Sequence, residues 1–224
     1  MYKITRPYPR PKGGGTKRKG LESMPDFETV SANLKAKGYA VSCFDTAEEA
    51  AAYLDREING VSAGFGGSVT LRDMGLYERL KSHNRVFWHW AGGDCPGQDA
   101  RVAAAGAEVY LTSVNALAET GEIVNIDGVG NRVSAQLYGH KKVYLVAGEN
   151  KLAKDFDAAL FRARNVASPK NAQRLGKKTP CAAKGDRCYD CKSPERICRA
   201  LAVLWCAPDG CAYEVVLIRE ALGY

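Results

Sequence analysis

Apolar residues recur along the chain with the spacing of helices and strands in alternation, from residue 26 onward. Asp26 can cap a helix that ends before Gly38, and the apolar run from Tyr39 to Cys43 then has the pattern of a strand. Thr46 starts a second helix with a capping-box sequence. The same alternation predicts strands over residues 61–65, 85–90, 108–111, 122–126, 142–147 and 213–219, and helices over 71–80, 99–105 and 151–164.

Strands separated by helices of this length imply crossover connections between parallel strands. We therefore expect an α/β protein with a mainly parallel sheet and helices on both faces. Ligands of such open sheets bind beyond the carboxyl ends of the strands. The loops after Phe65, Leu111, Ile126 and Ala147 are thus the places to look for chemistry.

The C-terminal part contains two apolar runs separated by a turn with Pro208 and Gly210, which predicts a hairpin over residues 200–219. Cys206 and Cys211 would then face each other across this hairpin. They could form a disulfide, add metal ligands or pack as small apolar side chains, and packing is the favoured interpretation.

The length of 224 residues suits a single domain, which we place at residues 21–224. No uninterrupted apolar stretch reaches transmembrane length. The net charge of +7 comes from the first 20 residues, which contain seven Lys or Arg and no acid, so that 25 basic and 25 acidic residues remain in the rest. With its prolines and glycines, this segment reads as a flexible basic tail, and we expect no specific nucleic-acid target for it.

The sequence after Met1 has neither an apolar run nor a small-residue cleavage site, so we expect a cytoplasmic protein whose thiols stay reduced. Six of its eight cysteines lie near the C-terminus. Four of them form a C-x6-C-x2-C-x6-C pattern within the loop 179–199, namely Cys181, Cys188, Cys191 and Cys198. This pattern favours an iron–sulfur cluster or a zinc ion, without choosing between them, over idle or regulatory thiols.

A second candidate site follows the strand that ends at Phe65. Gly66 and Gly67 allow close approach of the backbone, and Ser68 follows them in the loop. Thr70 or Asp73 can cap the next helix, whose free N–H groups attract phosphate or carboxylate. The loop lacks the P-loop and dinucleotide-binding patterns, so nucleotide binding is poorly supported. A plain tight turn is the competing interpretation.

A third group of polar residues surrounds the strand 122–126. Glu119 or Asp127 could serve as a carboxylate for proton transfer or nucleophilic attack, with Asn115, Asn131 and Arg132 holding an anionic substrate. The simpler alternative is a hairpin that turns near residue 121 and again after residue 127.

Lys151, after the strand 142–147, could add a positive charge to the same rim, although a surface lysine is the simpler interpretation. His83, His89 and His140 show no spacing of a ligand pair, and the run from Phe87 to Trp90 has the pattern of a buried strand.

Several motifs occur together along the chain: Gly66-Gly67-Ser68-x-Thr70-Leu71, Leu111-Thr-Ser-x-Asn115-Ala116, Ile123-Val-Asn-Ile-Asp-Gly-x-Gly-Asn-Arg-Val133, Asn150-Lys151, Asn171-x-x-Arg174-Leu175, Thr179-Pro-Cys181, Cys188-x-Asp190-Cys191-x-Ser193-x-x-Arg196-Ile-Cys198 and Leu222-Gly-Tyr224. Over about residues 26–224 the chain therefore resembles the lactate-utilisation (LUD-domain) family, in particular its small cysteine-containing members. The resemblance implies a fold like that of ribose-5-phosphate isomerase, glucosamine-6-phosphate deaminase and CoA transferases. It also implies a role near lactate oxidation, where partner proteins carry iron–sulfur clusters.

The resulting hypothesis is a protein of lactate or related organic-acid metabolism that holds an iron–sulfur cluster or zinc through the four cysteines. It would act in or with an oxidoreductase assembly of other lactate-utilisation proteins, and it could form a homo-oligomer. The alternative is a metal-independent enzyme for a sugar phosphate or acyl-CoA that uses the loop Gly66–Thr70 and Glu119.

Overall fold

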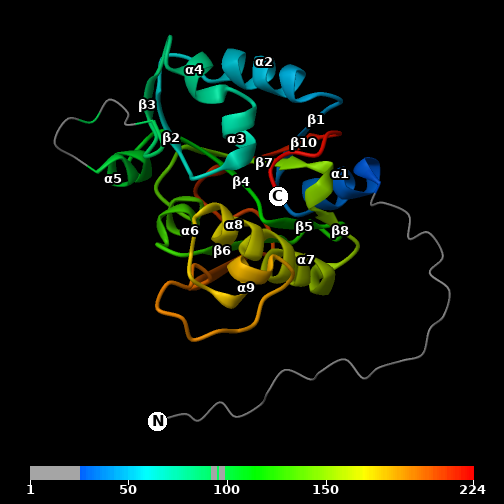
Figure 1. Cartoon of the computed structure of the whole chain (residues 1–224). Helices are drawn as coiled ribbons and strands as arrows, with labels where there is room; N and C mark the ends of the chain where they lie inside the picture. Colours follow the sequence, from blue (N-terminus) through cyan, green and yellow to red (C-terminus); the bar gives the residue numbers. More distant parts are fainter. Residues whose placement is uncertain (1–25, 92–94, 96–98) are drawn as a thin grey trace, which may run out of the picture.

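The computed structural model describes residues 26–91, 95 and 99–224 (Figure 1). The predicted basic tail over residues 1–20 lies outside this part of the chain. The described residues form two β-sheets and a set of helices that pack around them. Among these residues no helix is long and apolar enough to cross a membrane.

The main sheet has six strands, and every neighbouring pair is parallel, which confirms the predicted α/β class. Its strand order is β1-β10-β7-β4-β2-β3. The strands span Ala40–Phe44 (β1), Ser62–Phe65 (β2), Arg85–Phe87 (β3), Val109–Ser113 (β4), Lys142–Gly148 (β7) and Ala212–Ile218 (β10).

The second sheet has four strands in the order β8-β5-β6-β9. They span Ala116–Ala118 (β5), Ile123–Asp127 (β6), Leu152–Ala153 (β8) and Ala200–Leu204 (β9). The antiparallel pair β5 and β6 turns at Gly121, whose φ of +95° lies in the left-handed region that glycine tolerates. This hairpin is the simpler of the two alternatives that the sequence suggests for the polar residues around the strand 122–126.

The prediction of a hairpin over residues 200–219 is wrong. β9 pairs with β6 in the second sheet, whereas β10 lies in the main sheet between β1 and β7. The physical reason is the burial of β10, in which Tyr213–Ile218 is buried on both faces. A strand of this kind needs a sheet covered on both sides, and a two-stranded hairpin cannot offer it.

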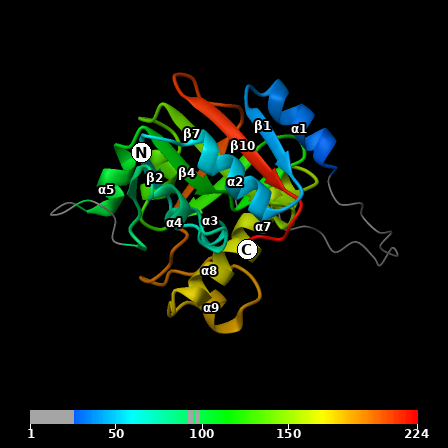
Figure 2. The ribbon, with the colours of Figure 1, turned by 90° about the horizontal axis from the view of Figure 1, so that it is seen from above.

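Side chains of the main sheet point alternately into two apolar cores. In β7, Tyr144 and Val146 pack with helices α2, α3 and α4, while Val143 and Leu145 pack with α1, α5 and the second sheet. Helices therefore cover one face, and the second sheet with two helices covers the other (Figures 1 and 2). These helices span Phe27–Ala36 (α1), Ala47–Glu57 (α2), Val69–Asp73 (α3), Leu76–Leu80 (α4) and Ala100–Ala105 (α5).

The outer face of the second sheet is covered by a helical stretch of three segments, Phe156–Arg162 (α7), a π-helical turn Ala163–Ala167 and Ser168–Arg174 (α8). Small side chains of both partners let the helix approach the sheet closely, as Ala159 and Ala163 pack against Ala116 and Ala118. The π-helical turn precedes Pro169, which has no N–H to donate to the preceding turn.

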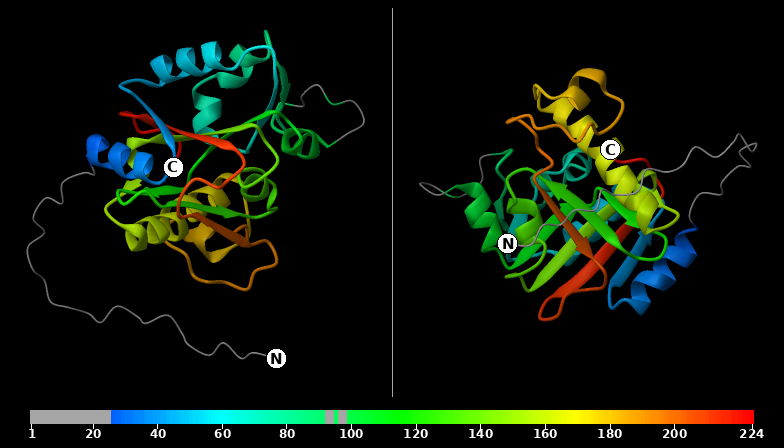
Figure 3. Two further views of the ribbon diagram at one scale, coloured as in Figure 1. Left: turned by 180° about the vertical axis from the view of Figure 1, so that it is seen from behind. Right: turned by 90° about the horizontal axis from the view of Figure 1, so that it is seen from below.

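Two further helices span Asn131–Ala135 (α6) and Pro180–Lys184 (α9), and a 3-10 helical turn spans Glu149–Lys151. In Figure 2, α8 and α9 lie beyond the end of the main sheet toward which β1 and β10 point. After α9 the chain loops out on the same side of the molecule before it returns as β9 (orange in Figures 1 and 3).

The predicted helix boundaries differ from the structure in two places. Asp26 and the Thr46 capping box start α1 and α2 as predicted. The helix predicted over 71–80 is instead two short helices, because Gly75 between them takes a left-handed φ of +65°. The helix predicted from Lys151 begins only after Asp155, whose side chain caps α7.

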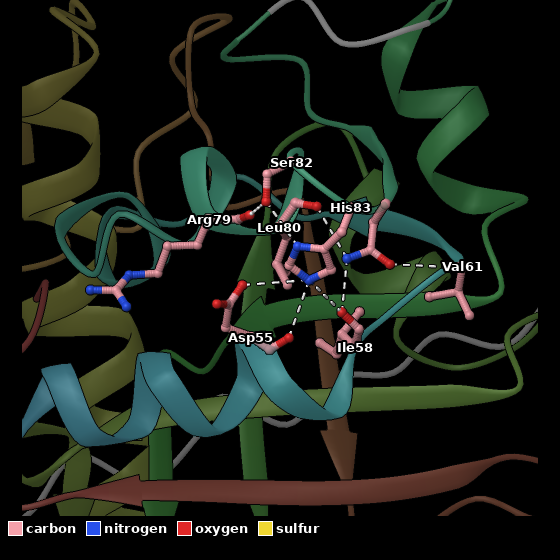
Figure 4. Close-up of polar contacts among 8 residues, drawn as sticks. Asp55, Ile58, Val61, Arg79, Leu80, Ser82 and His83 are labelled. Carbon is pink, nitrogen blue, oxygen red and sulfur yellow. Dashed lines mark hydrogen bonds and ion pairs between the residues drawn. The ribbon is translucent and has the colours of Figure 1, made fainter.

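His83 connects the end of α4 to the end of α2 (Figure 4). Its Nε2 lies 3.1 Å from the carbonyl oxygen of Ile58 and 3.2 Å from that of Asp55, so this nitrogen carries the hydrogen and donates. Nδ1 lies 2.8 Å from the hydroxyl oxygen of Ser82. His83 thus satisfies carbonyl groups that a helix end leaves open, which is a structural role.

Candidate functional site

A cavity of about 640 Å³ opens beyond the carboxyl ends of β2, β4 and β7. Its wall includes residues 67–70 after β2, Asn115 after β4, 127–129 after β6, and Lys151 after β7. The four loops selected from the strand pattern therefore do meet at one cavity. Residues of α8 and residues 194–197 of the Cys-rich loop also line the cavity.

The glycine loop after β2 contributes to the cavity in different ways. Gly66 does not line the cavity, because its neighbours enclose it: a β-carbon there would lie 2.8 Å from Thr112 Oγ1 and 3.0 Å from Arg132 Cγ. Gly67 lines the cavity. The buried hydroxyl of Ser68 caps α3 and donates to Ser113 Oγ at 2.8 Å. Packing and capping thus account for Gly66 and Ser68.

Asp127, a predicted catalytic carboxylate, lines the cavity but is held by backbone amides. Its Oδ1 accepts hydrogen bonds from the N–H groups of Gly128 and Val129, and its Oδ2 accepts from those of Arg132 and Val133. Four donors occupy both oxygens, so the carboxylate fixes the turn that leads into α6. This arrangement fits a structural role better than that of a base or nucleophile.

Arg132, predicted to hold a substrate anion, is 9% exposed and bonds to the protein itself. Its Nη1 donates to Asn125 Oδ1 at 2.6 Å and to the Ser113 carbonyl at 3.2 Å. Its Nη2 donates to the Ile126 carbonyl at 2.6 Å and to Asn115 Oδ1 at 3.2 Å. The guanidinium group therefore joins the ends of β4 and β6 and gives the cavity wall a buried positive charge.

Lys151 is the most unusual charged residue of the site, because it is only 2% exposed and yet lines the cavity. Its Nζ donates a hydrogen bond of 2.8 Å to Thr70 Oγ1. Burial lowers the pKa of Lys151 to about 7, with smaller contributions from the positive charges of Arg162 and Arg132. The amine therefore titrates near neutral pH, unlike the surface lysine of the simpler interpretation.

Arg174 on α8 also lines the cavity. Its guanidinium lies 4.8 Å from the ring centre of Trp90, and its Nε donates to Tyr224 Oη at 2.7 Å. Asn171 Oδ1 accepts from both Nε and Nη2. The described residues supply no hydrogen-bond partner for Nη1, which leaves one face of this arginine for a ligand.

The charged lining of the cavity is mainly positive. Asp127 and Glu195 are the two acids among the lining residues, and the carboxylate of Glu195 accepts from the Lys178 N–H at 3.0 Å. The seven basic lining residues are Arg101, Arg132, Lys151, Arg174, Lys177, Arg196 and Arg199. Such a lining favours a negatively charged ligand.

Two other predicted site residues take different positions. Asn131 lines the cavity as the first residue of α6. Glu119 does not line it; it follows β5 at the turn of the β5–β6 hairpin, where its carbonyl accepts from Asn33 Nδ2 of α1 at 2.8 Å. The reason is the direction of β5, which starts near the cavity after Asn115 and carries the chain away from it.

Several lining residues had no role assigned from sequence. Asn171, Arg174 and Tyr224 were only parts of the family pattern, and His89 and Trp90 were expected in a buried strand. β3 ends at Phe87, so His89 and Trp90 lie in a turn at the cavity. Burial lowers the pKa of His89. No local signal marks His89 and Trp90, because the apolar run from Phe87 to Trp90 continues past the end of the strand.

The four cysteines of the predicted metal site are all partly exposed. Arg164 Nη2 lies 3.8 Å from Cys188 Sγ, Arg196 Nη2 lies 3.4 Å from Cys198 Sγ, and the Asp190 N–H donates to Cys188 Sγ at 3.4 Å. In the part of the chain that the structure describes, no three His, Cys, Asp or Glu side chains are grouped so that they could hold a metal ion. The thiols as placed do not form a ligand set, and the iron–sulfur or zinc site stays a prediction.

Comparison with known proteins supports the resemblance read from the motifs. The family model of the LUD domain matches residues 27–210. A crystal structure of a DUF162 family protein from Deinococcus radiodurans shares the fold, with a TM-score of 0.50, 11% sequence identity, and coverage of 85% of this chain and 94% of that one. No curated protein was found to match the chain. Because the match to the family model spans most of the sequence, from α1 to the turn before β10, the chain belongs to the LUD-domain family of lactate-utilisation proteins.

Proposed function

We propose that this LUD-domain protein binds a small organic anion of lactate or related organic-acid metabolism in the cavity beyond β2, β4 and β7. The observation that carries this proposal is the excess of basic over acidic side chains in the lining. Asp127 is one of the two acids, and its charge is already offset by four backbone N–H groups. The net positive charge of the wall is therefore available to a ligand.

The size of the cavity supports a small molecule as the ligand. Its volume of about 640 Å³ falls within the range of roughly 300–1,000 Å³ that is usual for such sites. Both terminal nitrogens of Arg132 already donate to protein acceptors. Arg174, whose Nη1 has no partner among the described residues, is therefore the group best placed to bind the carboxylate of a short molecule.

The metal-independent alternative, an enzyme acting on a sugar phosphate or acyl-CoA, keeps part of its support. Gly67, Ser68 and Thr70 line the same cavity, as that hypothesis requires. Glu119, its expected base or nucleophile, is not among the lining residues. A phosphorylated ligand is thus a second chemical class to test in this cavity, with a group other than Glu119 to carry any reaction.

Thermal unfolding of the purified protein with lactate, pyruvate, a sugar phosphate or CoA tests the proposal. A ligand that binds only the folded protein raises the melting temperature, and the stabilisation grows with the logarithm of the ratio of ligand concentration to Kd. We expect a shift with a 2-hydroxy or 2-oxo acid that is lost in Arg174→Gln. The matched control is Lys170→Gln, because Lys170 is exposed on the same helix and does not line the cavity. Equal shifts in both variants, or no shift with any acid, would contradict the proposal.

A second candidate function is electron transfer with an iron–sulfur cluster, or structural zinc binding, in an oxidoreductase assembly with other lactate-utilisation proteins. One observation favours thiolate chemistry in the Cys-rich loop. Arg164 and Arg196 direct cationic donors at the sulfur atoms of Cys188 and Cys198, where they would offset the negative charge of a cluster or zinc site. Metal analysis of anaerobically purified protein tests this candidate, and copurification tests for partner subunits or a homo-oligomer.

A further inference from the structure

The environment of Lys151 differs from that of Lys142, a partly buried lysine that forms an ion pair. Lys142 Nζ lies 2.7 Å from Glu214 Oε2. Burial is the largest single effect and lowers the pKa of Lys142, but hydrogen bonds and Coulomb interactions with Glu214 and Tyr144 together raise it. Lys151 has no carboxylate within ion-pair distance among the described residues, and its Nζ bonds to the neutral hydroxyl of Thr70. A lysine that has only a neutral partner is poised to be an uncharged amine.

The charges around Lys151 act in the same direction. Arg162 and Arg132 both lower the pKa of Lys151, and Asp73 is the one group that opposes them. Arg162 is fixed close by, because its Nε donates to the carbonyl of Asn150, the residue before Lys151, at 2.8 Å. Desolvation beside other cations is an established way to make a lysine amine nucleophilic at neutral pH.

The position of the amine in the site is also fixed. Thr70 Oγ1 accepts from Lys151 Nζ and donates to the Leu222 carbonyl at 3.3 Å. Gly223 packs on this pair, since a β-carbon at Gly223 would lie 2.8 Å from Thr70 Oγ1 and 3.6 Å from Lys151 Nζ. The side chain is thereby held in one place at the wall of an anion-binding cavity instead of extending into solvent.

We propose that Lys151 is a nucleophile that captures a 2-oxo acid in this cavity as an imine, with the carboxylate of the acid bound by Arg174. This inference rests on the proposed anion-binding function and names the substrate class. The neutral amine attacks the carbonyl carbon, a C–N bond forms, and the carbonyl oxygen leaves as water with the two amine hydrogens. No electrons are gained or lost in this step.

The test is reductive trapping of the full-length protein. Wild-type protein is incubated with pyruvate and sodium cyanoborohydride at pH 7, and the intact mass and tryptic peptides are measured. We expect one reduced imine on Lys151, formed on the order of 100-fold faster than on exposed lysines, because an ordinary lysine is almost fully protonated at this pH. Lys177, which lines the cavity but is more exposed, serves as the internal comparison in the same digest.

Two controls separate this inference from the proposed function. Lactate has the same carboxylate without a carbonyl, so it should give no adduct and should slow trapping of pyruvate by competition. Lys151→Arg removes the amine and should abolish the adduct, and circular dichroism checks that this variant folds. The peptide map of the wild type identifies the modified lysine without any variant. If pyruvate raises the melting temperature but no adduct forms on Lys151, the nucleophile is refuted and anion binding stands. If no acid changes the melting temperature, both proposals fail.

Discussion

Lys151 Nζ lies 2.8 Å from Thr70 Oγ1, although the two residues are 81 positions apart in the chain. The contact exists because β7 and β2 flank β4 in the main sheet, so the loops at their carboxyl ends face each other. Gly223, still farther along the chain, closes over the same pair. Three segments that are distant in the sequence thus determine the position and hydrogen bonding of the Lys151 amine.

Replacing Thr70 by Val should destabilise the protein. The change keeps the shape but leaves the buried Lys151 amine without its hydroxyl acceptor, at a cost of about 1–3 kcal/mol in the free energy of unfolding. Urea unfolding measures it. Thr70→Ser keeps the hydroxyl and should recover most of the loss; if Ser and Val are equally unstable, packing of the methyl group is the cause.

The stability of the protein should depend on pH through Lys151. The pKa of Lys151 is lowered to about 7 in the folded state, against about 10.4 for an unfolded lysine. Between these values the unfolded chain binds more protons than the folded one, so the free energy of unfolding rises with pH from about 7 upward. Below pH 7 both states are protonated and this contribution is flat.

The measurement compares wild type with Lys151→Met by urea unfolding between about pH 6.5 and 9.5. Wild type should gain up to about 3 kcal/mol relative to the variant over this interval, from 1.36 kcal/mol for each pKa unit. Groups shared by both proteins, such as Cys43 and Cys211 with their raised pKa values, cancel in the difference. Parallel curves would show that Lys151 stays charged in the folded protein.

Gly66→Ala should be costly because of the neighbours that its β-carbon would meet. The new methyl group would lie 2.8 Å from Thr112 Oγ1 and 3.0 Å from Tyr110 Oη, both in the buried strand β4. Overpacking of this kind costs about 1–3 kcal/mol. Gly106→Ala is the matched control, since its β-carbon would have no neighbour closer than 3.8 Å; thermal unfolding should show a large shift only for Gly66→Ala.

Asp127→Ala should weaken the turn before α6. It removes the acceptor of four backbone N–H groups, and losing a cap of this type typically costs about 1 kcal/mol. Asp127→Asn keeps one acceptor oxygen and should cost less. A stable Asp127→Ala protein that binds acids normally but has lost a measured turnover would instead support the catalytic role predicted from sequence.

Anaerobically purified protein decides the metal hypothesis. If the loop 179–199 closes around a cluster or zinc, the protein should contain stoichiometric iron and sulfide, or zinc, and Cys188→Ser, Cys191→Ser should lose it. The matched control is Cys206→Ser, Cys211→Ser, outside the four-cysteine pattern. Metal-free wild type that is folded and equally stable would contradict the hypothesis, as would retention of the metal by the first double variant.

Local sequence signals were enough for most of the fold. The caps at Asp26 and Thr46 and the apolar runs of β7 and β10 depend on neighbouring residues in the chain, and they predicted helices, strands and a parallel sheet. The pattern failed where long-range pairing decided the outcome. β9 resembles half of a hairpin, but its partner is β6, about 75 residues earlier.

The same distinction holds for the site. The strand pattern predicts which loops meet, because parallel strands bring their carboxyl ends to one edge, and its candidates Ser68, Thr70, Asn115, Asn131 and Lys151 are among the lining residues. What each group can do depends on contacts that form only in the folded chain. Hydrogen-bond saturation of Arg132 and Asp127, burial of Lys151, and the placement of Glu119 at the turn beyond β5 arise from contacts between distant segments, which no local pattern records.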